Sequence, residues 1–597
     1  MSDATLTARR PRAIAGPRTR AAGIVLAAAV AAALPLVAGD PYVVYLATLV
    51  GIYALVAMGL NLLFGYAGQV SLGHGALVAV GAYVAAVLTT TYGWSFWAAL
   101  PAAMVAAGLV GSLMALPALR LTAWYLALIT LAFGMVVNGL LVEMREITGG
   151  FSGILGVPRP EVGGLPLDDP GFFWLVLAFV VVTYVVLRNL VRSRIGRGLI
   201  SVRDAEEAAR SSGADIVRLK VFAFFLSAVL AGAAGALLAG FKGMVTPDDF
   251  TIDFSVFFLL VVIVGGAGRL GGPVVGVLAF FVLPELLGAL AEWRLLVYGA
   301  VLLVVAVYAP HGIAGAWSRW WRSRRPPAPP VGEPPPEPSG AAPPRDALSL
   351  SARGLAKGFG GVRALRSADL EVPAGTIHAV VGPNGSGKTT LLNTITGYVR
   401  ADGGTVQLGG RGTGRRSPHR MARAGVGRTF QTPRLLPELS ALDNVLLGAY
   451  ARERSPAAVI ATGLPWARRE ATALAAEAMA YLRFVGLGDV AGQQAGTLPH
   501  GKQRLLEIGR ALMARPSLLL LDEPAAGLSM TELDALGRLL REIRAEGATV
   551  VLIEHHIELV AEVSDAVTVL HEGATLLSAP PAAALSDDRV VDVYLGR

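Results

Sequence analysis

The sequence contains no cysteine and little charge. Only 16% of its 597 residues are Asp, Glu, Lys or Arg, well below the roughly 25% that is usual in soluble proteins. The absence of cysteine excludes disulfide bonds and thiolate metal sites. The shortage of charge is concentrated in residues 21–325, where long apolar runs dominate, whereas the C-terminal part has a soluble composition. The apolar runs exclude a wholly soluble enzyme, so we predict a membrane region joined to a soluble domain.

The positive charge is concentrated beside the apolar runs. A formal net charge of +8 can indicate nucleic-acid binding, but cytoplasmic membrane edges are also enriched in Lys and Arg. We favour the second explanation and predict no nucleic-acid partner. Residues 1–20 form a basic tail with five arginines, which we place in the cytoplasm. A cleaved signal peptide is the alternative, but the length of the following apolar run favours an uncleaved span.

Residues 21–325 are predicted to form an all-α, polytopic membrane domain of about ten helices. A spanning helix needs about 20 apolar residues. Candidates lie near 21–39, 43–64, 67–88, 97–118, 121–142, 171–190, 221–241, 254–268, 274–291 and 294–310. An even number of spans places the arginine-rich 188–220 loop and the soluble domain on the same side as the N-terminus. We expect a multi-pass protein of the inner, cytoplasmic membrane with its soluble domain in the cytoplasm.

Two regions of the membrane domain are rich in glycine and polar residues. Asn61, Gln69, Ser71 and His74 would be costly facing lipid, and the glycines among them allow close packing or a broken helix of the kind that lines transporter pathways. Hydrogen bonding between helices, without contact to a transported solute, is the alternative. Residues 265–273 form the second such region.

Two connecting segments differ in character. In the cytoplasmic loop, residues 204–213 predict a short helix ended by glycine. This helix could be a solvated connection, but we favour a docking contact that carries conformational change to the spans. Residues 326–346 are rich in proline and predict an extended linker, although a ligand for a proline-binding module is an alternative.

Residues 347–597 change to short strands alternating with amphipathic helices, which predicts an α/β domain. An apolar strand at 378–381 is followed by a glycine-rich loop and a helix start, the context of a phosphate-binding loop. The loop consists of Gly382, Pro383, Asn384, Gly385, Ser386, Gly387, Lys388, Thr389 and Thr390. Its backbone N–H groups would surround nucleotide phosphates. Lys388 would reach the terminal phosphates, and the Thr389 hydroxyl would ligate Mg²⁺.

A pair of carboxylates follows a second buried strand. The run 518–521 is entirely leucine and leads into Asp522 and Glu523. We predict that Asp522 holds Mg²⁺ and that Glu523 acts as general base toward the attacking water.

Three further residues are candidates for the same site. Gln431 stands where a glutamine contacting Mg²⁺ and water is needed, and His555 follows another apolar strand and could sense the γ-phosphate. A structural histidine is the alternative for His555. Phe359 precedes the phosphate loop and could stack on adenine, or it could belong to the core.

Together these motifs resemble the ATPase of an ABC transporter. Residues 498–502, Leu-Pro-His-Gly-Lys, resemble the signature that is usually Leu-Ser-Gly-Gly-Gln, and only Gly501 retains its position within the central Ser-Gly-Gly. Pro499 replaces the serine whose hydroxyl would bond the γ-phosphate. The segments 428–435, 506–512 and 522–528 resemble the ATPases of branched-chain amino acid importers. Residues 61–76, 148–150 and 264–268 resemble a permease of the same importers.

The resemblance implies a permease fused to its ATPase within a heteromeric importer. It implies ATP and Mg²⁺ as cofactors, Gly501 as a contact to nucleotide across an ATPase dimer, and three partners: a second permease, a second ABC ATPase and an extracytoplasmic substrate-binding protein. Branched-chain amino acids are the expected cargo. Urea, amides or aromatic acids are alternative cargoes, and a non-transport, ATP-regulated membrane protein is the alternative function.

Overall fold

The computed structural model describes residues 28–119, 123–282, 293–309, 312–323 and 346–595. The basic tail 1–20, nearly all of the linker 326–346 and parts of the first and ninth predicted spans lie outside these ranges. The chain divides into two units, Met1–Arg188 with Lys220–Pro330, and Asn189–Leu219 with Val331–Arg597. The cytoplasmic loop at 189–219 therefore belongs by its contacts to the soluble unit.

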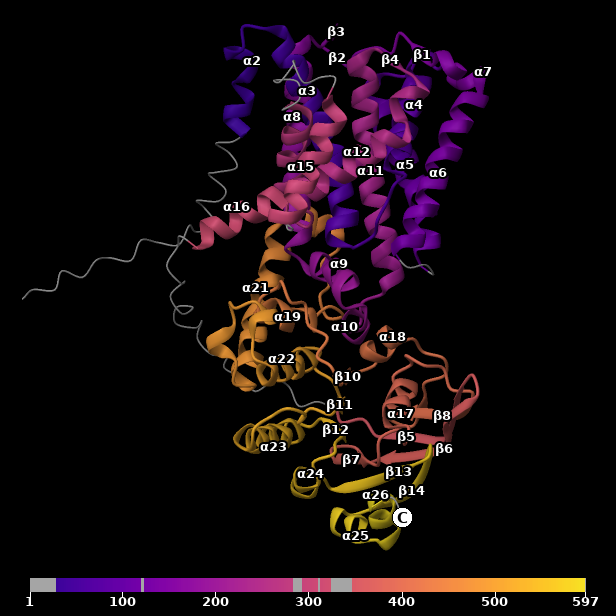
Figure 1. The fold of residues 1–597 in the computed structure, drawn as a ribbon, viewed down its shortest axis with the longest axis vertical. Helices are drawn as coiled ribbons and strands as arrows, with labels where there is room; N and C mark the ends of the chain where they lie inside the picture. Colours follow the sequence, from indigo (N-terminus) through magenta and orange to yellow (C-terminus); the bar gives the residue numbers. More distant parts are fainter. Residues whose placement is uncertain (1–27, 120–122, 283–292, 310–311, 324–345, 596–597) are drawn as a thin grey trace, which may run out of the picture. The chain divides into compact units, whose positions relative to one another are not determined.

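The first unit is helical (Figure 1). Its helices are α2 (Leu34–Val37), α3 (Pro41–Leu60), η1 (Asn61–Tyr66), α4 (His74–Thr90), α5 (Phe96–Ala118), α6 (Ala123–Glu143), α7 (Arg145–Thr148), η2 (Gly150–Ser152), α8 (Asp169–Val191), α11 (Ile216–Lys242), η3 (Pro247–Phe250), α12 (Ile252–Gly265), α13 (Gly272–Val277), η4 (Leu278–Val282), α15 (Arg294–Tyr308) and α16 (Gly312–Ser323). Two short antiparallel strand pairs accompany them, β1 (Ile154–Leu155) with β4 (Met244–Val245), and β2 (Glu161–Val162) with β3 (Leu165–Pro166).

Among the described residues, five helices are long and apolar enough to cross a membrane. They are Pro41–Tyr66, Phe96–Ala118, Trp124–Glu143, Asp169–Val191 and Ile216–Lys242. The apolar helices α4, α12 and α15 are shorter than the 20 residues that a simple span needs. The membrane character of this unit is thus evident in the structure, whereas the count of ten spans stays a prediction.

The predicted span near 67–88 is helical only from His74 onward. The chain continues from α3 into a π-helical turn, leaves helical geometry after Tyr66 and starts α4 only at His74. A Cβ on Gly73 would lie 2.3 Å from the Thr130 carbonyl oxygen, so only glycine allows this close approach. The broken helix that the glycines suggested is therefore present.

The polar side chains of this region differ in their partners. The Asn61 amide donates to the Arg269 carbonyl oxygen at 3.0 Å and accepts from the Gly268 N–H at 2.9 Å. Asn61 therefore joins the two glycine-rich regions. Ser71 and His74 are buried, and their polar side-chain atoms have no hydrogen-bond partner among the described residues.

The second unit is an α/β domain, as predicted. Within the described residues it has one ten-stranded sheet, in the order β10-β11-β12-β7-β13-β14-β6-β5-β8-β9. The strands are β5 (Leu350–Phe359), β6 (Val362–Val372), β7 (Ile377–Val381), β8 (Gly403–Leu408), β9 (Arg411–Gly412), β10 (Val426–Arg428), β11 (Leu518–Asp522), β12 (Thr549–Ile553), β13 (Ala566–His571) and β14 (Ala574–Ala579). The five strands from β10 to β13 run parallel, so their carboxyl ends share one edge.

Helices cover both faces of this sheet. They are α17 (Lys388–Ile395), α18 (Pro418–Arg423), α19 (Ala441–Leu447), α20 (Ala457–Thr462), α21 (Pro465–Phe484), η6 (Gly488–Val490), η7 (Ala495–Thr497), α22 (His500–Met513), α23 (Met530–Ala545), α24 (Ile557–Val563), α25 (Pro581–Leu585) and α26 (Asp588–Leu595). Leu519 and Leu521 of β11 belong to one core cluster, and Leu518 and Leu520 to another. This alternation explains why the strand is apolar at every position.

The docking loop, residues 189–219, contains two helices in place of the single one predicted. They are α9 (Arg194–Asp204) and α10 (Glu206–Ser211). Ala205 has φ −154° and ψ 73°, so the helix expected to begin at residue 204 cannot start there. Gly213, with φ +84°, follows α10, in agreement with the predicted glycine stop.

Candidate nucleotide site and docking surface

The glycine-rich loop connects buried strand β7 to α17, as predicted. Gly387 has φ +102°, and a Cβ there would lie 2.5 Å from the Ala364 carbonyl oxygen. Gly385 has φ +84° and nothing within 4 Å of the place where a Cβ would be, so its backbone is open to a ligand. Asn384 and Thr389 are exposed, whereas Ser386 and Lys388 are buried. The loop therefore presents backbone and hydroxyl groups outward.

Lys388 lies inside its own loop. Its ammonium donates to the carbonyl oxygens of Gly382 at 2.7 Å and Pro383 at 2.9 Å. Burial lowers the pKa of Lys388, while the nearby charges of Glu523 and Asp522 oppose that shift. The lysine is held at the centre of the loop, where phosphate oxygens would replace two carbonyls as its partners.

Asp522 ends β11 and is buried. Its Oδ1 atom has no hydrogen-bond partner in the described part of the chain. Its Oδ2 atom lies 3.8 Å from a guanidinium nitrogen of Arg428. Burial raises the pKa of Asp522 to about 6, although Arg428 pulls it downward. A buried carboxylate with one unsatisfied oxygen is suited to receive a cation.

Glu523 is held by two of the predicted residues. Its Oε2 accepts from the Gln431 amide at 3.0 Å, and its Oε1 lies 2.8 Å from His555 Nε2. Burial raises the pKa of Glu523, but the bonds from Gln431 and His555 outweigh it and the net direction is downward. Glu523 is therefore ionised at neutral pH. The backbone φ of Glu523 is +49°, which is unusual for a non-glycine residue. Its position at the edge of the sheet and its side-chain bonds to Gln431 and His555 hold the backbone in this conformation.

Two predicted residues lie apart from this cluster. Phe359, at the end of β5, has 48% of its surface exposed, with the Lys357 ammonium 5.4 Å from the ring centroid. An exposed ring is available for stacking and is not part of the core. Gly501 lies in the first turn of α22, and no hydrogen bond joins it to the phosphate loop among the described residues.

Sequence reasoning missed several buried charges around the site. Glu554 is buried and accepts from the N–H groups of Ala525 at 2.6 Å and His555 at 3.1 Å. It therefore holds the backbone at Ala525, two residues after Glu523, and the backbone of His555 itself. Arg504 of α22 donates to the Glu523 carbonyl oxygen at 2.6 Å. Glu554 could have been found from the sequence, because it directly follows the apolar run of β12. Nothing in the local sequence distinguishes Arg504.

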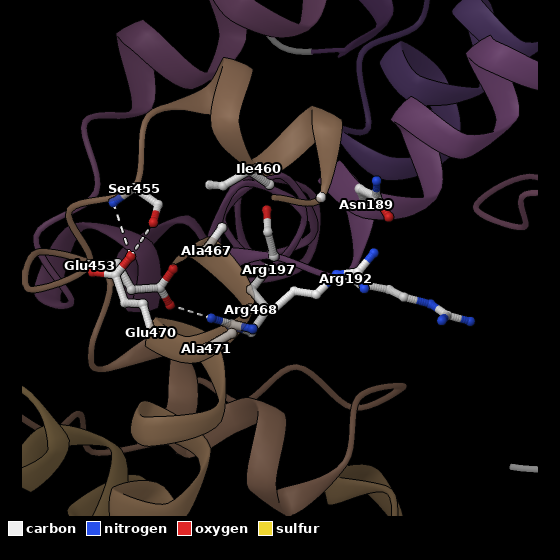
Figure 2. Close-up of a pocket in the computed structure, with 12 residues that line it drawn as sticks. Asn189, Arg192, Arg197, Glu453, Ser455, Ile460, Ala467, Arg468, Glu470 and Ala471 are labelled. Atoms are coloured by element: carbon white, nitrogen blue, oxygen red, sulfur yellow. Dashed lines mark hydrogen bonds and ion pairs between the residues drawn. The ribbon is translucent and has the colours of Figure 1, made fainter. Parts of the chain in front are cut away.

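The docking loop contacts the ATPase side of its unit through a buried ion pair. Arg197 of α9 bonds to Glu453 at 2.5 Å, and burial raises the pKa of Glu453 against the opposing effect of Arg197. Arg194 donates to the carbonyl oxygens of Glu453 and Ser455. Figure 2 shows Arg197 and Glu453 at one pocket, together with Asn189 and Arg192 of the loop and Ser455 beside Glu470. The docking loop is thus anchored by buried charge.

Comparison with known proteins agrees with both halves. A family model described as branched-chain amino acid transport system / permease component matches residues 42–306, and one described as ABC transporter matches residues 365–526. The permease protein LivM of the high-affinity branched-chain amino acid transport system of Escherichia coli (strain K12) is 36% identical over 292 residues, which cover 45% of this chain and 69% of LivM.

The C-terminal half has its own relatives. The high-affinity branched-chain amino acid transport ATP-binding protein BraF of Pseudomonas aeruginosa is 38% identical over 248 residues, which cover 41% of this chain and 97% of BraF. A crystal structure of a nucleotide-free ATP-binding cassette from an ABC transporter is 32% identical, covers 42% of this chain and 100% of that chain, and has a TM-score of 0.38.

A helical membrane unit joined to a nucleotide-binding ATPase domain defines an ABC transport protein, in which ATP hydrolysis is coupled to transport. The chain belongs to the branched-chain amino acid family of ABC transporters, with a permease component and an ATP-binding component in one polypeptide. Its relatives are separate permease and ATP-binding components of multi-component systems.

Proposed function

We propose that this chain is the fused permease–ATPase subunit of a heteromeric importer of branched-chain amino acids or related small polar solutes across the inner, cytoplasmic membrane. The observation that carries the proposal is the cluster of Glu523, Gln431 and His555 beside the phosphate loop, in the same chain as a permease. A second permease, a second ABC ATPase and an extracytoplasmic binding protein would complete the complex. The ATPase domain would lie in the cytoplasm, where ATP is available.

Glu523 is the proposed general base. Its carboxylate is ionised, its two oxygens are oriented by Gln431 and His555, and its backbone is held by Arg504. An oriented, charged carboxylate can accept a proton from a water that attacks the γ-phosphate. His555 would then contact the phosphate with its imidazole, and Lys388 would pair with the β- and γ-phosphates.

The residues present fit Mg²⁺ and a nucleotide. The unsatisfied Oδ1 of Asp522, the exposed hydroxyl of Thr389 and the amide of Gln431 supply the oxygen ligands that Mg²⁺ prefers. Among the described residues no group of three or more His, Asp or Glu could hold a metal alone, so the phosphates would contribute ligands. Bound Mg²⁺ would supply charge neutralisation at the phosphates. The whole loop from Gly382 to Thr390 would surround them, Phe359 would stack on the adenine, and Gly501 would face the nucleotide held by the partner ATPase.

A pocket of the membrane unit is the proposed cargo path. It lies between the start of α4, α6 and the start of α12, and it combines apolar and polar lining. Asn138 donates to the Pro247 carbonyl oxygen at 3.0 Å, and Ser255 accepts from the Gly75 N–H at 2.9 Å, so the broken helix forms one wall. Asp253 could pair with the ammonium of an amino acid while Leu72 and Phe250 contact its apolar side chain.

The proposal is tested by reconstituting the chain with its partner subunits in lipid vesicles that contain ATP. Labelled leucine, urea and benzoate are offered with the binding protein. We expect ATP-dependent accumulation of leucine, lost in Glu523→Gln. Accumulation of urea or benzoate in place of leucine would show that the cargo is one of the alternative solutes. ATP hydrolysis at a rate independent of the binding protein and of every solute would favour the non-transport alternative.

A further inference from the structure

Arg428 occupies an unusual place beside the catalytic carboxylates. It ends β10, the strand next to β11, and only 4% of its surface is exposed. One guanidinium nitrogen lies 3.8 Å from Asp522 Oδ2, and another donates to the Thr396 hydroxyl at 2.6 Å. Its Nε has no hydrogen-bond partner in the described structure. Arg428 is thus a buried cation that faces the proposed metal-binding carboxylate.

Two aromatic rings hold the guanidinium of Arg428. Its Cζ lies 5.2 Å from the Tyr398 ring centroid and 5.1 Å from that of Phe430. The two rings contact each other edge-to-face at 5.7 Å. A planar guanidinium against aromatic faces is attracted by their π-electrons. A displacement of the guanidinium would therefore change its contacts with the Tyr398 and Phe430 rings.

Tyr398, and the chain segment that follows Phe430, both contact Glu207 of the docking loop. The Tyr398 hydroxyl donates to the Glu207 carbonyl oxygen at 2.8 Å. Arg434, four residues after Phe430, pairs with the Glu207 carboxylate at 2.8 Å. Glu207 is on α10, so its carbonyl oxygen is held by Tyr398 and its carboxylate by Arg434, which lies on the same segment as Phe430.

The segment after Phe430 is itself anchored. Glu507 of α22 accepts from the N–H groups of Phe430 at 3.3 Å and Arg434 at 3.0 Å, and it pairs with Arg510 at 2.8 Å. Arg510 also donates to the Arg434 carbonyl oxygen. This buried pair limits how far residues 430–434 can move, so Tyr398 is the freer of the two connections to α10.

We propose that Arg428 is a positioning residue that links the charge state of Asp522 to the contact between Tyr398 and the docking helix α10. Without a bound cation, Arg428 is drawn toward the Asp522 carboxylate. When Asp522 is neutralised by a divalent cation at Oδ1, that attraction falls, and the guanidinium and the Tyr398 ring beside it change position. The hydroxyl of Tyr398 then changes its hold on Glu207. The inference rests on the proposed binding of Mg²⁺ by Asp522.

The absence of cysteine makes the test direct. Asp215 belongs to the docking loop and His419 to α18, with His419 Nε2 3.8 Å from Asp215 Oδ2, and neither is one of the cluster of Arg428, Tyr398 and Phe430. Asp215→Cys with His419→Cys creates one reporter pair in a chain without other thiols. In the assembled complex, the cross-linking rate with a short bis-maleimide is measured with ATP plus Mg²⁺ and with ATP plus chelator, in a Glu523→Gln background that retains nucleotide.

We expect the rate to differ several-fold between the two conditions, and the difference to vanish in Arg428→Met. Arg428→Lys keeps the charge without the planar group and should retain part of the difference. Tyr398→Phe removes only the hydroxyl and should lose most of it. Tyr450→Phe is the matched control, because Tyr450 is a second largely buried tyrosine near the docking loop, with Arg194 5.8 Å from its ring.

Unchanged affinity for ATP in chelator shows that each variant is folded. A parent complex whose rate ignores Mg²⁺, or a Tyr398→Phe variant that responds like the parent, overturns the inference. If the parent transports cargo in vesicles and only the cross-linking response is missing, the linkage fails and the proposed function stands. Loss of ATP-dependent transport in the parent is instead the failure of the proposed function.

Discussion

The two units bury polar groups in different ways. Around the nucleotide site the buried groups are charged and paired, as in Arg510 with Glu507 and Arg428 with Asp522. In the membrane unit most buried polar groups are neutral, and several bond to backbone, as when Ser227 donates to the Gly59 carbonyl oxygen at 2.6 Å. Water can reach a soluble domain during folding, whereas an unpaired charge within lipid is costly. The ATPase can therefore respond to ligand charge, and the permease depends on close backbone packing.

Substituting a charged residue of the nucleotide site should give the largest effect of the tests of this contrast. Glu523→Gln keeps the shape of the side chain but removes the proposed base, so ATP hydrolysis by the assembled complex should fall by about 100-fold or more. Fluorescent-nucleotide binding should stay close to that of the parent, because the substitution leaves the phosphate loop unchanged. A variant that hydrolyses ATP at the parental rate would remove Glu523 from the mechanism.

Packing should dominate in the membrane unit. A Cβ on Gly81 of α4 would lie 2.4 Å from the Gly232 Cα of α11, whereas a Cβ on Gly139 of α6 would meet nothing within 4 Å. Gly81→Ala should therefore destabilise the detergent-solubilised protein by about 1–3 kcal/mol, and Gly139→Ala should be neutral or stabilising. Thermal unfolding of the two variants gives the comparison, and equal midpoints would contradict it.

The charged site should also respond to pH. Burial raises the pKa of Asp522 to about 6, and the cation proposed to bind there would bind only the ionised form. Affinity for Mg²⁺–ATP should be full above pH 6 and fall by up to about tenfold per pH unit below it. Asp522→Asn should show a flat profile over the same range.

The pH dependence of folding stability at Asp522 is opposite to that of metal affinity. Because the folded-state pKa exceeds the ordinary value, the stability that Asp522 contributes is present at low pH and is lost as pH rises through 6. In the parent, metal affinity should therefore rise with pH while the stability contributed by Asp522 falls. Asp522→Asn should lack both of these contributions. Calorimetry at pH 5 and pH 7, with and without Mg²⁺–ATP, would measure the two effects separately.

The smallest expected effect is on cargo. Asp253 is exposed in the proposed pocket, so its pairing with an amino acid should be weak. Asp253→Asn should raise the KM for leucine uptake about two- to fivefold without changing maximal hydrolysis. Asp248→Asn is the control, since that carboxylate is exposed nearby and does not line the pocket. Equal KM values in the two variants would place the cargo elsewhere.

The nucleotide loop could be predicted because its requirements are local. Gly387 must have a positive φ and leave no room for a side chain, and such needs leave a pattern in neighbouring positions. The role suggested for Arg428 could not be predicted, because it depends on β10 lying beside β11 and on Tyr398 packing from a distant segment. The docking helix was misplaced for a related reason. Acidic and alanine residues near 204 favour a helix, yet Ala205 is extended where α9 ends and α10 begins.

The docking loop also bears on why this polypeptide is a fusion at all. Residues 189–219 are anchored in the soluble unit by buried groups such as Arg197 and Glu453, so the hold between engine and channel does not depend on the proline-rich tether. A protease cut within 326–346 should leave two fragments that still copurify. On that outcome, the proposed consequence of the linker is a fixed ratio of one ATP-binding component to one permease component, which are separate proteins among the relatives.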